Sequence, residues 1–187
     1  MTQTLTVDVF LSVDGWAGSA VSPGYFGYHG PELEKWIDDQ LGEPQLVVFG
    51  RHTYELLADP PEEARDASWH RLTELDKIVF STTLETASWP NTRVGRDLTT
   101  EIARLKRDGD VPLRTVGSLS VTRQLCAAGL VDRLRLMTFP LLVGPAGREP
   151  FFADAVSTDL ELVGHRALDG RVLLIEYRPT GRDIPRG

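Results

Sequence analysis

The chain has 187 residues, of which 41% are hydrophobic and 25% are charged, and its formal net charge is −7. These values are typical of one soluble globular domain and argue against a general role in binding nucleic acid or acidic membranes. No apolar run approaches the roughly 18 residues that span a bilayer, and the N-terminus lacks the pattern of a signal peptide. We therefore expect a cytoplasmic protein.

The first forty residues predict a strand, a long loop and a helix. Residues 4–11 alternate and are rich in Val and Leu, which favours a strand, and Ser12-Val13-Asp14-Gly15 ends it. The following loop, up to Gly30, is long for a compact domain, and such loops often cover sites. Residues 31–41 read as a helix with Pro31 in its first turn.

Two strand-to-helix junctions stand out in the middle of the chain. A continuously apolar run over 45–49 ends at Gly50, and a helical pattern follows. A second strand, over 113–116, ends at Gly117, and a helix follows over 118–128, closed by Gly129. Such junctions present free backbone N–H groups and a helix N-terminus to an anionic ligand.

The remaining segments complete an alternating pattern of strands and helices. Helices are predicted over 69–75 and 98–107, and strands over 76–81, within 89–95, and over 131–139, 159–168 and 171–177. The Asp169-Gly170 dipeptide predicts a tight hairpin between the last two strands. The pattern predicts one α/β domain over 1–178, with a mostly parallel sheet, an antiparallel hairpin at one edge and a solvated tail over 179–187.

The single cysteine, Cys126, lies in the helical pattern and cannot form an internal disulfide. A buried, small apolar role suits it best. Cysteine and histidine residues are not clustered at metal-ligand spacing, so no metal site is predicted.

Six short motifs occur in the order found in one known family. They are Ser12-Val13-Asp14-Gly15, Gly50-Arg51-His52-Thr53-Tyr54-Glu55, Phe80-Ser81-Thr82-Thr83-Leu84, Val116-Gly117-Ser118-Leu119, Leu130-Val131-Asp132-Arg133-Leu134 and Pro140-Leu141-Leu142-Val143-Gly144. From about Leu5 to Tyr177 the chain resembles the three-layer α/β/α dihydrofolate-reductase-like fold. Within that fold it is most similar to the RibD C-terminal (riboflavin biosynthesis reductase-like) domain family.

The resemblance implies a reductase that binds NADPH across the carboxyl ends of the parallel strands. It implies that the backbone of Phe10 approaches the nicotinamide. It assigns the adenosine-side phosphates to Gly50, Arg51, His52 and Thr53, the adenine ribose to Ser81 and Thr82, and the pyrophosphate to Gly117, Ser118 and Leu119. A homodimer is also implied, and the apolar strand containing Leu134, Leu136, Met137 and Phe139 is expected at an exposed edge.

Physical chemistry supports part of this assignment and leaves alternatives. Cations are disfavoured at helix N-termini, so Arg51 and His52 make more sense beside an anion, and an NADPH 2′-phosphate would supply one. The alternative is a tight-turn Gly50 with a solvated Arg51. Ser118 can bond a phosphate oxygen or act as an ordinary N-cap.

Asp14 is the candidate catalytic residue. A carboxylate with a raised pKa near the nicotinamide could protonate the substrate, although Asp14-Gly15 is also a common turn dipeptide. Five aromatic residues, Trp16, Tyr25, Phe26, Tyr28 and Trp36, could line a pocket for a planar substrate, with core packing as the alternative for Trp36. The remaining histidines, His29, His70 and His165, are interpreted as surface residues.

Three departures argue against the riboflavin-pathway reaction itself. Val116 replaces the first glycine of a usual Gly-Gly pair, and Thr115-Val116 lacks the acidic residue common before that glycine. No zinc-deaminase half precedes the reductase-like half. The carboxylates of the first helix, Glu32, Glu34, Asp38 and Asp39, do not match the proton-donor motif of dihydrofolate reductases.

The sequence therefore predicts an NADPH-dependent reductase of a small heterocyclic, carbonyl or imine substrate. A catalytically silent nucleotide- or ligand-binding protein of the same fold is the main alternative. A purely structural or stress-related dimer is a third.

Overall fold

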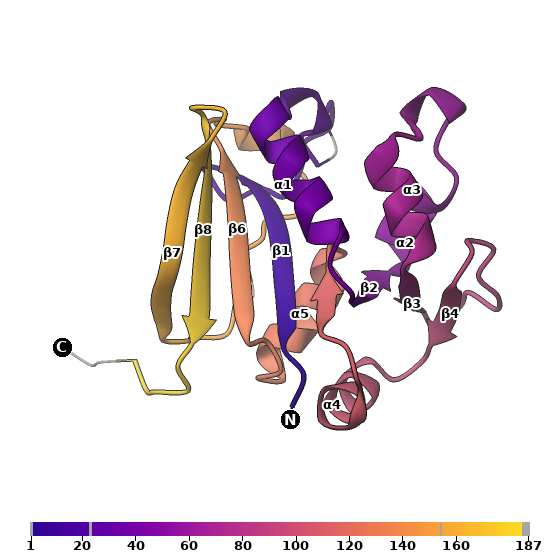
Figure 1. Cartoon of the computed structure of the whole chain (residues 1–187). Coiled ribbons are helices and arrows are strands. Elements are labelled where there is room, and N and C mark those ends of the chain that lie inside the picture. Colours follow the sequence, from indigo (N-terminus) through magenta and orange to yellow (C-terminus); the bar gives the residue numbers. More distant parts are fainter. Residues whose placement is uncertain (1, 23, 154, 185–187) are drawn as a thin grey trace.

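The computed structural model of the chain describes residues 2–22, 24–153 and 155–184. These residues form an eight-stranded sheet in the order β4-β3-β2-β5-β1-β6-β8-β7 (Figure 1). The strands are β1 (Leu5–Ser12), β2 (Leu46–Gly50), β3 (Asp76–Phe80), β4 (Thr92–Gly95), β5 (Leu113–Thr115), β6 (Arg133–Phe139), β7 (Leu160–Leu168) and β8 (Val172–Pro179). Strands β1 to β6 are parallel, and β8 is antiparallel to both β6 and β7, which confirms the predicted sheet.

Helices cover both faces of the sheet and complete three layers. They are α1 (Pro31–Leu41), α2 (Arg51–Ala58), α3 (Ala67–Glu74), α4 (Leu98–Asp108) and α5 (Leu119–Ala127). Apolar clusters join α1, α2 and α3 to one face, and a separate cluster joins α4 and α5 to the other. No helix in the described ranges is long and apolar enough to cross a membrane.

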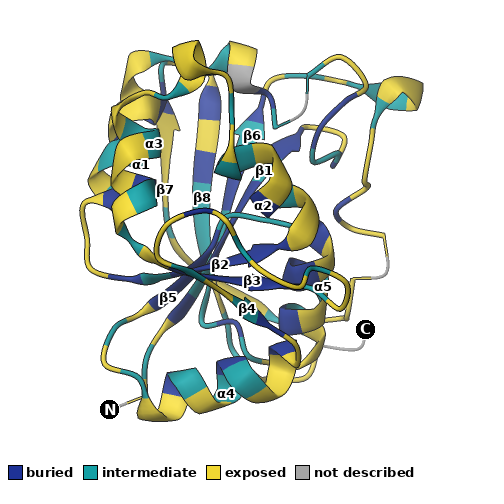
Figure 2. Ribbon diagram, turned by 90° about the vertical axis from the view of Figure 1, so that its right-hand side faces the viewer, coloured by how far each residue is buried: buried dark blue, intermediate teal, exposed yellow. Residues whose placement is uncertain are grey.

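The alternation of β1 separates the two cores. Val7, Val9 and Leu11 pack in the cluster of α4 and α5, whereas Phe10 packs in the cluster of α1. Most residues of β1, β2, β3, β5 and β6 are buried, whereas the outer helix surfaces and most of β7 are exposed (Figure 2). Burial on both faces explains why β2 reads as one continuous apolar run.

The β7–β8 hairpin also fixes the start of α1. Asp169 and Gly170 have φ values of 54° and 63°, as a two-residue hairpin turn requires, which confirms the predicted hairpin. The Asp169 carboxylate accepts hydrogen bonds from the Glu32 and Leu33 N–H groups, at 2.8 and 3.1 Å. Gly30, at the N-cap, has no side chain to do this, so a residue more than 130 positions away caps the helix.

The expectation of an exposed edge at β6 is wrong. Strand β6 lies between β1 and β8, and Leu134, Leu136, Met137 and Phe139 are buried. The edge strand on this side of the sheet is β7, where Leu160, Leu162 and Val163 are exposed. The apolar residues of β6 are buried because helices cover the sheet and β8 pairs with the outer side of β6. The order of the strands along the chain does not show that the β7–β8 hairpin lies beyond β6 in the sheet.

Candidate functional site

Strand connections on the two sides of β5 and β1 run in opposite directions. From β1 the chain passes through α1 to β2, and from β5 it passes through α5, on the other face, to β6. In open α/β sheets such a reversal creates a crevice at the carboxyl ends of the two strands, where ligands bind. Sheet topology therefore places the candidate site between the ends of β1 and β5.

The register shows a notch in the sheet at this point. Strand β1 pairs with β5 only from Leu5 to Val7, although it pairs with β6 as far as Ser12. Strand β2 likewise extends to Gly50, two residues beyond its last partner in β5. We call this region, formed by residues 10–12, 50 and 115–118, the β5 notch.

Phe10 presents its backbone to the β5 notch. The Leu113 N–H donates to the Thr4 carbonyl, so even-numbered residues of β1 direct their peptide groups toward β5. Phe10 lies beyond the last β5 residue that pairs with β1. Its N–H and C=O therefore face a position without a strand partner in the described sheet and are available to a ligand.

The two predicted glycine junctions are in direct contact. The Gly50 N–H donates to the Gly117 carbonyl at 3.2 Å. A Cβ atom at Gly50 would lie 2.0 Å from Ser118 Oγ, and one at Gly117, whose φ is 127°, would lie 2.6 Å from Thr53 Oγ1. Both positions require glycine for close approach. The Gly117–Ser118 peptide bond is cis.

Helices α2 and α5 both start at the β5 notch without side-chain caps. Gly50 and Ser118 are their N-cap residues, and neither makes a capping hydrogen bond with its side chain. Ser118 Oγ instead lies 2.9 Å from Ser120 Oγ. The first-turn N–H groups thus have no capping side chain. Leu119 has its side chain in the core, so only its backbone can contact a ligand.

Arg51 has an internal partner at the start of α2. Its Nε lies 2.6 Å from Glu55 Oε1, and its Nη1 donates to Thr83 Oγ1 at 2.5 Å. Glu55 offsets the unfavourable position of a cation at the helix start, so an anion is not needed to explain Arg51. His52 is exposed, and Thr53 is half-buried against Gly117.

A second arginine, which sequence reasoning missed, approaches the same turn. Arg96 Nη1 donates to the Ser81 carbonyl at 2.5 Å. Ser81 Oγ accepts from the N–H groups of Thr83 and Leu84, and Thr82 is exposed. The signal was present, because Gly95-Arg96 after β4 repeats Gly50-Arg51 after β2. Two guanidinium groups therefore meet at the turn after β3.

Asp14 is ionised and committed to a loop contact. It accepts hydrogen bonds from Ser12 Oγ at 2.6 Å, the Gly144 N–H at 2.7 Å and the Val143 N–H at 3.0 Å. These bonds, that from Ser12 first, lower its pKa to about 2. The expectation of a raised pKa is therefore wrong, because the carboxylate joins two loops in a polar, exposed setting.

The carboxylates of α1 have structural partners too. Glu32 accepts from the Asp169 N–H, and Asp38 accepts from Ser68 Oγ at 2.9 Å, which links α1 to α3. Asp39 pairs with Lys35 at 2.8 Å on the exposed face of the helix. None of these three side chains is directed by its contacts toward the β5 notch.

Most of the predicted pocket aromatics stabilise the scaffold. Tyr25 is buried, and its hydroxyl donates to the Trp16 carbonyl at 2.7 Å and accepts from the Gly18 N–H. Trp16 packs closely against Gly147. Tyr28 is half-buried, with the Arg171 guanidinium 5.3 Å from its ring centre. The side chain of Phe26 lies outside the described part of the chain.

Trp36 lies in the core, as the alternative interpretation held. The guanidinium groups of Arg114 and Arg135 lie 5.6 and 4.9 Å from its ring centre. Both arginines pair with Asp8, at 2.5 and 2.6 Å, beneath α1. This buried ionic network joins β5, β1 and β6, and no sequence pattern predicts it because its members are distant in the chain.

His29 is not the surface residue that was predicted. Its ring centre lies 5.3 Å from that of Phe10 and 6.0 Å from that of Phe139. Burial lowers the pKa of the imidazole, while Glu34, a hydrogen bond with the Gly24 backbone and Asp169 oppose that shift. His29 therefore lies on the α1 side of the sheet, beside the strand residue that faces the β5 notch.

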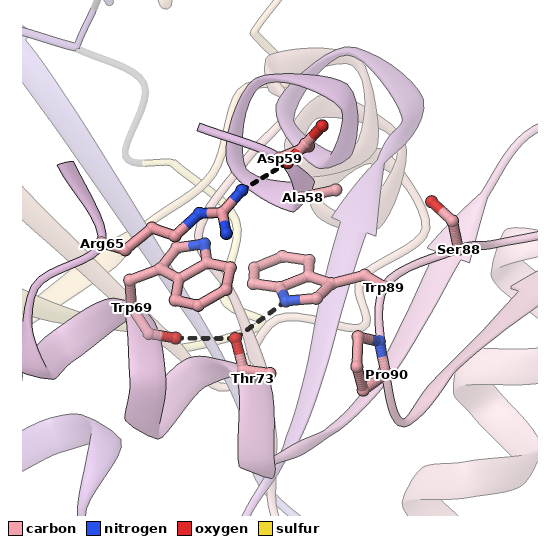
Figure 3. A pocket seen from close by; sticks show the side chains of 8 residues that line it. All are labelled: Ala58, Asp59, Arg65, Trp69, Thr73, Ser88, Trp89 and Pro90. Atoms are coloured by element: carbon pink, nitrogen blue, oxygen red, sulfur yellow. Dashed lines mark hydrogen bonds and ion pairs between the residues drawn. The ribbon is translucent and has the colours of Figure 1, made fainter. Parts of the chain in front are cut away.

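A separate hollow of about 340 Å³ lies between α2, α3 and the segment before β4 (Figure 3). We call it the Trp69–Trp89 hollow. Its lining residues are Ala58, Asp59, Arg65, Trp69, Thr73, Ser88, Trp89 and Pro90. Arg65 lies over the Trp69 ring and pairs with Asp59, and Thr73 Oγ1 accepts from Trp89 Nε1. These groups bind one another.

Comparison with known proteins agrees with the topology. Residues 3–174 match the RibD C-terminal domain family. The chain belongs to this family. Among curated relatives, the uncharacterized Bacillus subtilis protein YyaP is 25% identical over 149 residues, which cover 76% of this chain and 78% of YyaP.

Solved structures of low sequence identity share the fold. A putative riboflavin biosynthesis protein from Shewanella sp. PV-4 superposes with a TM-score of 0.73 at 16% identity, covering 96% of this chain and 99% of that one. A pyrimidine reductase-like protein from Corynebacterium diphtheriae gives 0.71 at 14% identity, with 97% and 93% covered. The bifunctional deaminase/reductase of Thermotoga maritima gives 0.68 at 15% identity, covering 95% of this chain but 57% of that longer one.

Proposed function

We propose that this protein is an NADPH-dependent reductase that transfers a hydride to a small planar substrate with a C=N or C=O bond. The contact between Gly50 and Gly117 at the β5 notch carries the proposal. It brings two uncapped helix starts together at a topological switch point, which suits a dinucleotide with two phosphate-bearing regions. Membership of the RibD C-terminal domain family supports it.

The residues at the notch fit such a cofactor. Cβ atoms at Gly50 and Gly117 would clash with Ser118 and Thr53. The two backbone segments therefore pack closely and carry no side chain at these positions. The pyrophosphate would bind at Gly117, Ser118 and the start of α5, and Phe10 would bond the carboxamide end through its backbone. When bound, NADPH supplies the hydride, and the protein orients the reactants.

Arg51 and Arg96 would select NADPH over NADH. Both guanidinium groups meet at the turn formed by Ser81 and Thr83, next to the start of α2. A 2′-phosphate would draw Arg51 from Glu55 and bond both arginines, since guanidinium groups donate paired hydrogen bonds to phosphate oxygens. His52 and Thr82 are exposed beside this turn and could contact the same phosphate or its ribose.

The substrate is proposed to differ from that of the riboflavin pathway. Position 115 is a fully buried threonine and position 116 a valine, so the β5 notch lacks a carboxylate just before Gly117. A carboxylate there would bind a polyhydroxylated chain through hydrogen bonds. Without it, recognition falls to the aromatic surface around Phe10, which favours a compact heterocycle or an apolar ketone or imine.

Titration with NADPH and NADH tests the proposal. We expect NADPH to raise the melting temperature and to change its nicotinamide fluorescence on binding. Arg51→Ala should weaken NADPH binding about tenfold, about 1.4 kcal/mol, and leave NADH binding unchanged. Arg104→Ala, an exposed α4 arginine with one distant partner, is the matched control. No response to millimolar NADPH would contradict the proposal.

The catalytically silent alternative has one observation in its favour. Asp14, the candidate proton donor, is ionised and held by three hydrogen bonds. Under that alternative the protein binds NADPH but oxidises it with no member of a panel of ketones, imines and pterins. Turnover of any panel member above the rate without enzyme would exclude it.

We also propose that the chain forms a homodimer through the β7–β8 hairpin. Leu160, Leu162, Val163 and Leu173 are exposed there, and β7 is an edge strand. An edge with an exposed apolar face is a common site for pairing with a second copy. Leu162→Lys should convert a dimer to a monomer in light scattering, and a monomeric wild-type chain would contradict this surface.

A further inference from the structure

Reduction of a C=N or C=O bond requires a proton as well as a hydride, and the predicted donor does not provide it. The carboxylate of Asp14 has a pKa of about 2 and accepts three hydrogen bonds. Tyr25, the buried phenol near α1, donates its proton to the Trp16 carbonyl. Glu32 is engaged by the Asp169 N–H. A different group has to serve if the proposed function holds.

His29 contacts the side chain of Phe10, the strand residue whose backbone faces the β5 notch. Phe10 lies in the part of β1 that extends beyond its last residue paired with β5, and its side chain lies on the α1 face of the sheet. The His29 ring meets the Phe10 ring edge to face and stacks on Phe139, with an interplanar angle of 18°. The imidazole is thus one aromatic ring away from the β5 notch, on the face that α1 covers.

The surroundings hold this imidazole in place and tune its titration. Phe10 comes from β1, Phe139 from β6, and a hydrogen bond joins the ring to the Gly24 backbone. The charged groups that act on it are Glu34 of α1 and Asp169 of the β7–β8 turn. Arg171 is the cation on this side, and it lies over the ring of Tyr28. A hydrogen bond from one ring nitrogen to the backbone sets which nitrogen can exchange a proton, and histidine is the most frequent general acid or base in enzymes.

We propose that His29 is the proton donor of this site. The substrate carbon gains the hydride that NADPH supplies, and the π-electron pair of the C=N or C=O bond moves to nitrogen or oxygen. That atom takes the proton of the His29 imidazolium. His29 then regains a proton from water, so one hydride and one proton are consumed for each bond reduced. This inference rests on the proposed function.

The four histidines of the chain allow a test without a known substrate. NMR titration of ¹³C-labelled histidine gives the imidazole pKa of each residue, and His29→Phe assigns the His29 signal while filling the aromatic cluster. The oxidised nicotinamide of NADP⁺ is positively charged and that of NADPH is neutral. If His29 faces this ring, its pKa should be about one unit lower in the NADP⁺ complex than in the NADPH complex, because like charges disfavour the imidazolium.

Other histidines serve as internal controls. His70, on α3, should keep one pKa in both complexes. His52, beside the proposed phosphate site, should shift equally with both cofactors, because they share the 2′-phosphate. Equal His29 pKa values in two complexes that form would overturn the inference and leave the proposed function standing. Failure of both cofactors to bind would overturn the proposed function and this inference with it.

Kinetics on any panel substrate that the wild type reduces separate proton donation from positioning. His29→Phe should lower kcat about 100-fold, within the range for general acids, and leave the Kd of NADPH unchanged. The wild-type rate should fall as pH rises through the His29 pKa, and the variant should lose that dependence. A variant with wild-type kcat and an unchanged pH profile would overturn the inference.

Discussion

The β5 notch and the Trp69–Trp89 hollow differ in what their polar groups do. In the hollow, Arg65 pairs with Asp59 and covers Trp69, and the indole N–H of Trp89 bonds Thr73. At the notch, two helix starts lack side-chain caps and a strand edge lacks a partner. The hollow is thus a packed surface depression, whereas the notch keeps backbone donors available for a ligand.

The comparison teaches that a hollow in this surface is not by itself a sign of a ligand site. The indole rings of Trp69 and Trp89 stack with their centres 6.2 Å apart, and Trp89 also contacts Phe49 and Lys77. The ring of Trp89 therefore packs against other residues of the protein. The notch exists because β5 is three residues long and its neighbours are longer. Sheet register, and not cavity size, therefore locates the candidate site.

The largest expected effect comes from removing the core of the hollow. Trp89→Ala should lower the free energy of unfolding by about 3–5 kcal/mol, because a large buried aromatic leaves a cavity. NADPH affinity of the folded variant should stay at the wild-type value. Urea unfolding and NADPH titration measure the two quantities. A large loss of affinity would show that the hollow and the notch are one functional unit.

The next effect breaks the notch itself. Gly117→Ala adds a Cβ atom 2.6 Å from Thr53 Oγ1 at a φ of 127°, so it should destabilise the fold by about 1–3 kcal/mol. NADPH affinity should fall at least tenfold. Gly129→Ala is the control, since φ there is 64° but no atom lies within 4 Å of the added Cβ. Equal affinities in the two variants would argue against a ligand at Gly117.

A smaller effect is expected at the outer end of the site. Arg96→Ala should reduce the preference for NADPH over NADH about tenfold, because a 2′-phosphate would lose one charged donor. The ratio of the two dissociation constants reports this change. Because the same ratio is unaffected by general destabilisation, an unchanged value would remove Arg96 from the site.

The smallest effect concerns pH. Asp14 has a folded pKa of about 2, below its ordinary 3.8, so its contribution to stability is present above pH 3.8 and is lost as pH falls toward 2. Asp14→Asn lacks it throughout. The difference in melting temperature between wild type and variant should therefore shrink between pH 5 and pH 2. A constant difference would mean that the ionised carboxylate is not what joins the two loops.

Local patterns predicted the fold and the two glycine junctions that meet at the β5 notch. The Asp169-Gly170 turn, the apolar β2 and the glycine junctions are each encoded within a few residues, so sequence reasoning found them. The resemblance then placed Phe10 and Gly117 at one site, and the register brings them to the same notch.

The rest depends on contacts between distant residues. The low pKa of Asp14 comes first from the neighbouring Ser12 and then from loop contacts, among them Gly144, 130 positions away. The half-buried His29 packs against Phe10 of β1 and Phe139 of β6. The burial of β6 follows from a hairpin that folds back beside it. No short pattern reports such contacts, which explains why the predictions for His29 and for the edge strand were wrong.

A crystal structure of the complex with NADP⁺ tests the central claim most directly. The account predicts the pyrophosphate at the start of α5 beside Gly117, the 2′-phosphate between Arg51 and Arg96, and the nicotinamide at the backbone of Phe10. Cofactor density in the Trp69–Trp89 hollow, or anywhere that leaves the β5 notch empty, would contradict it.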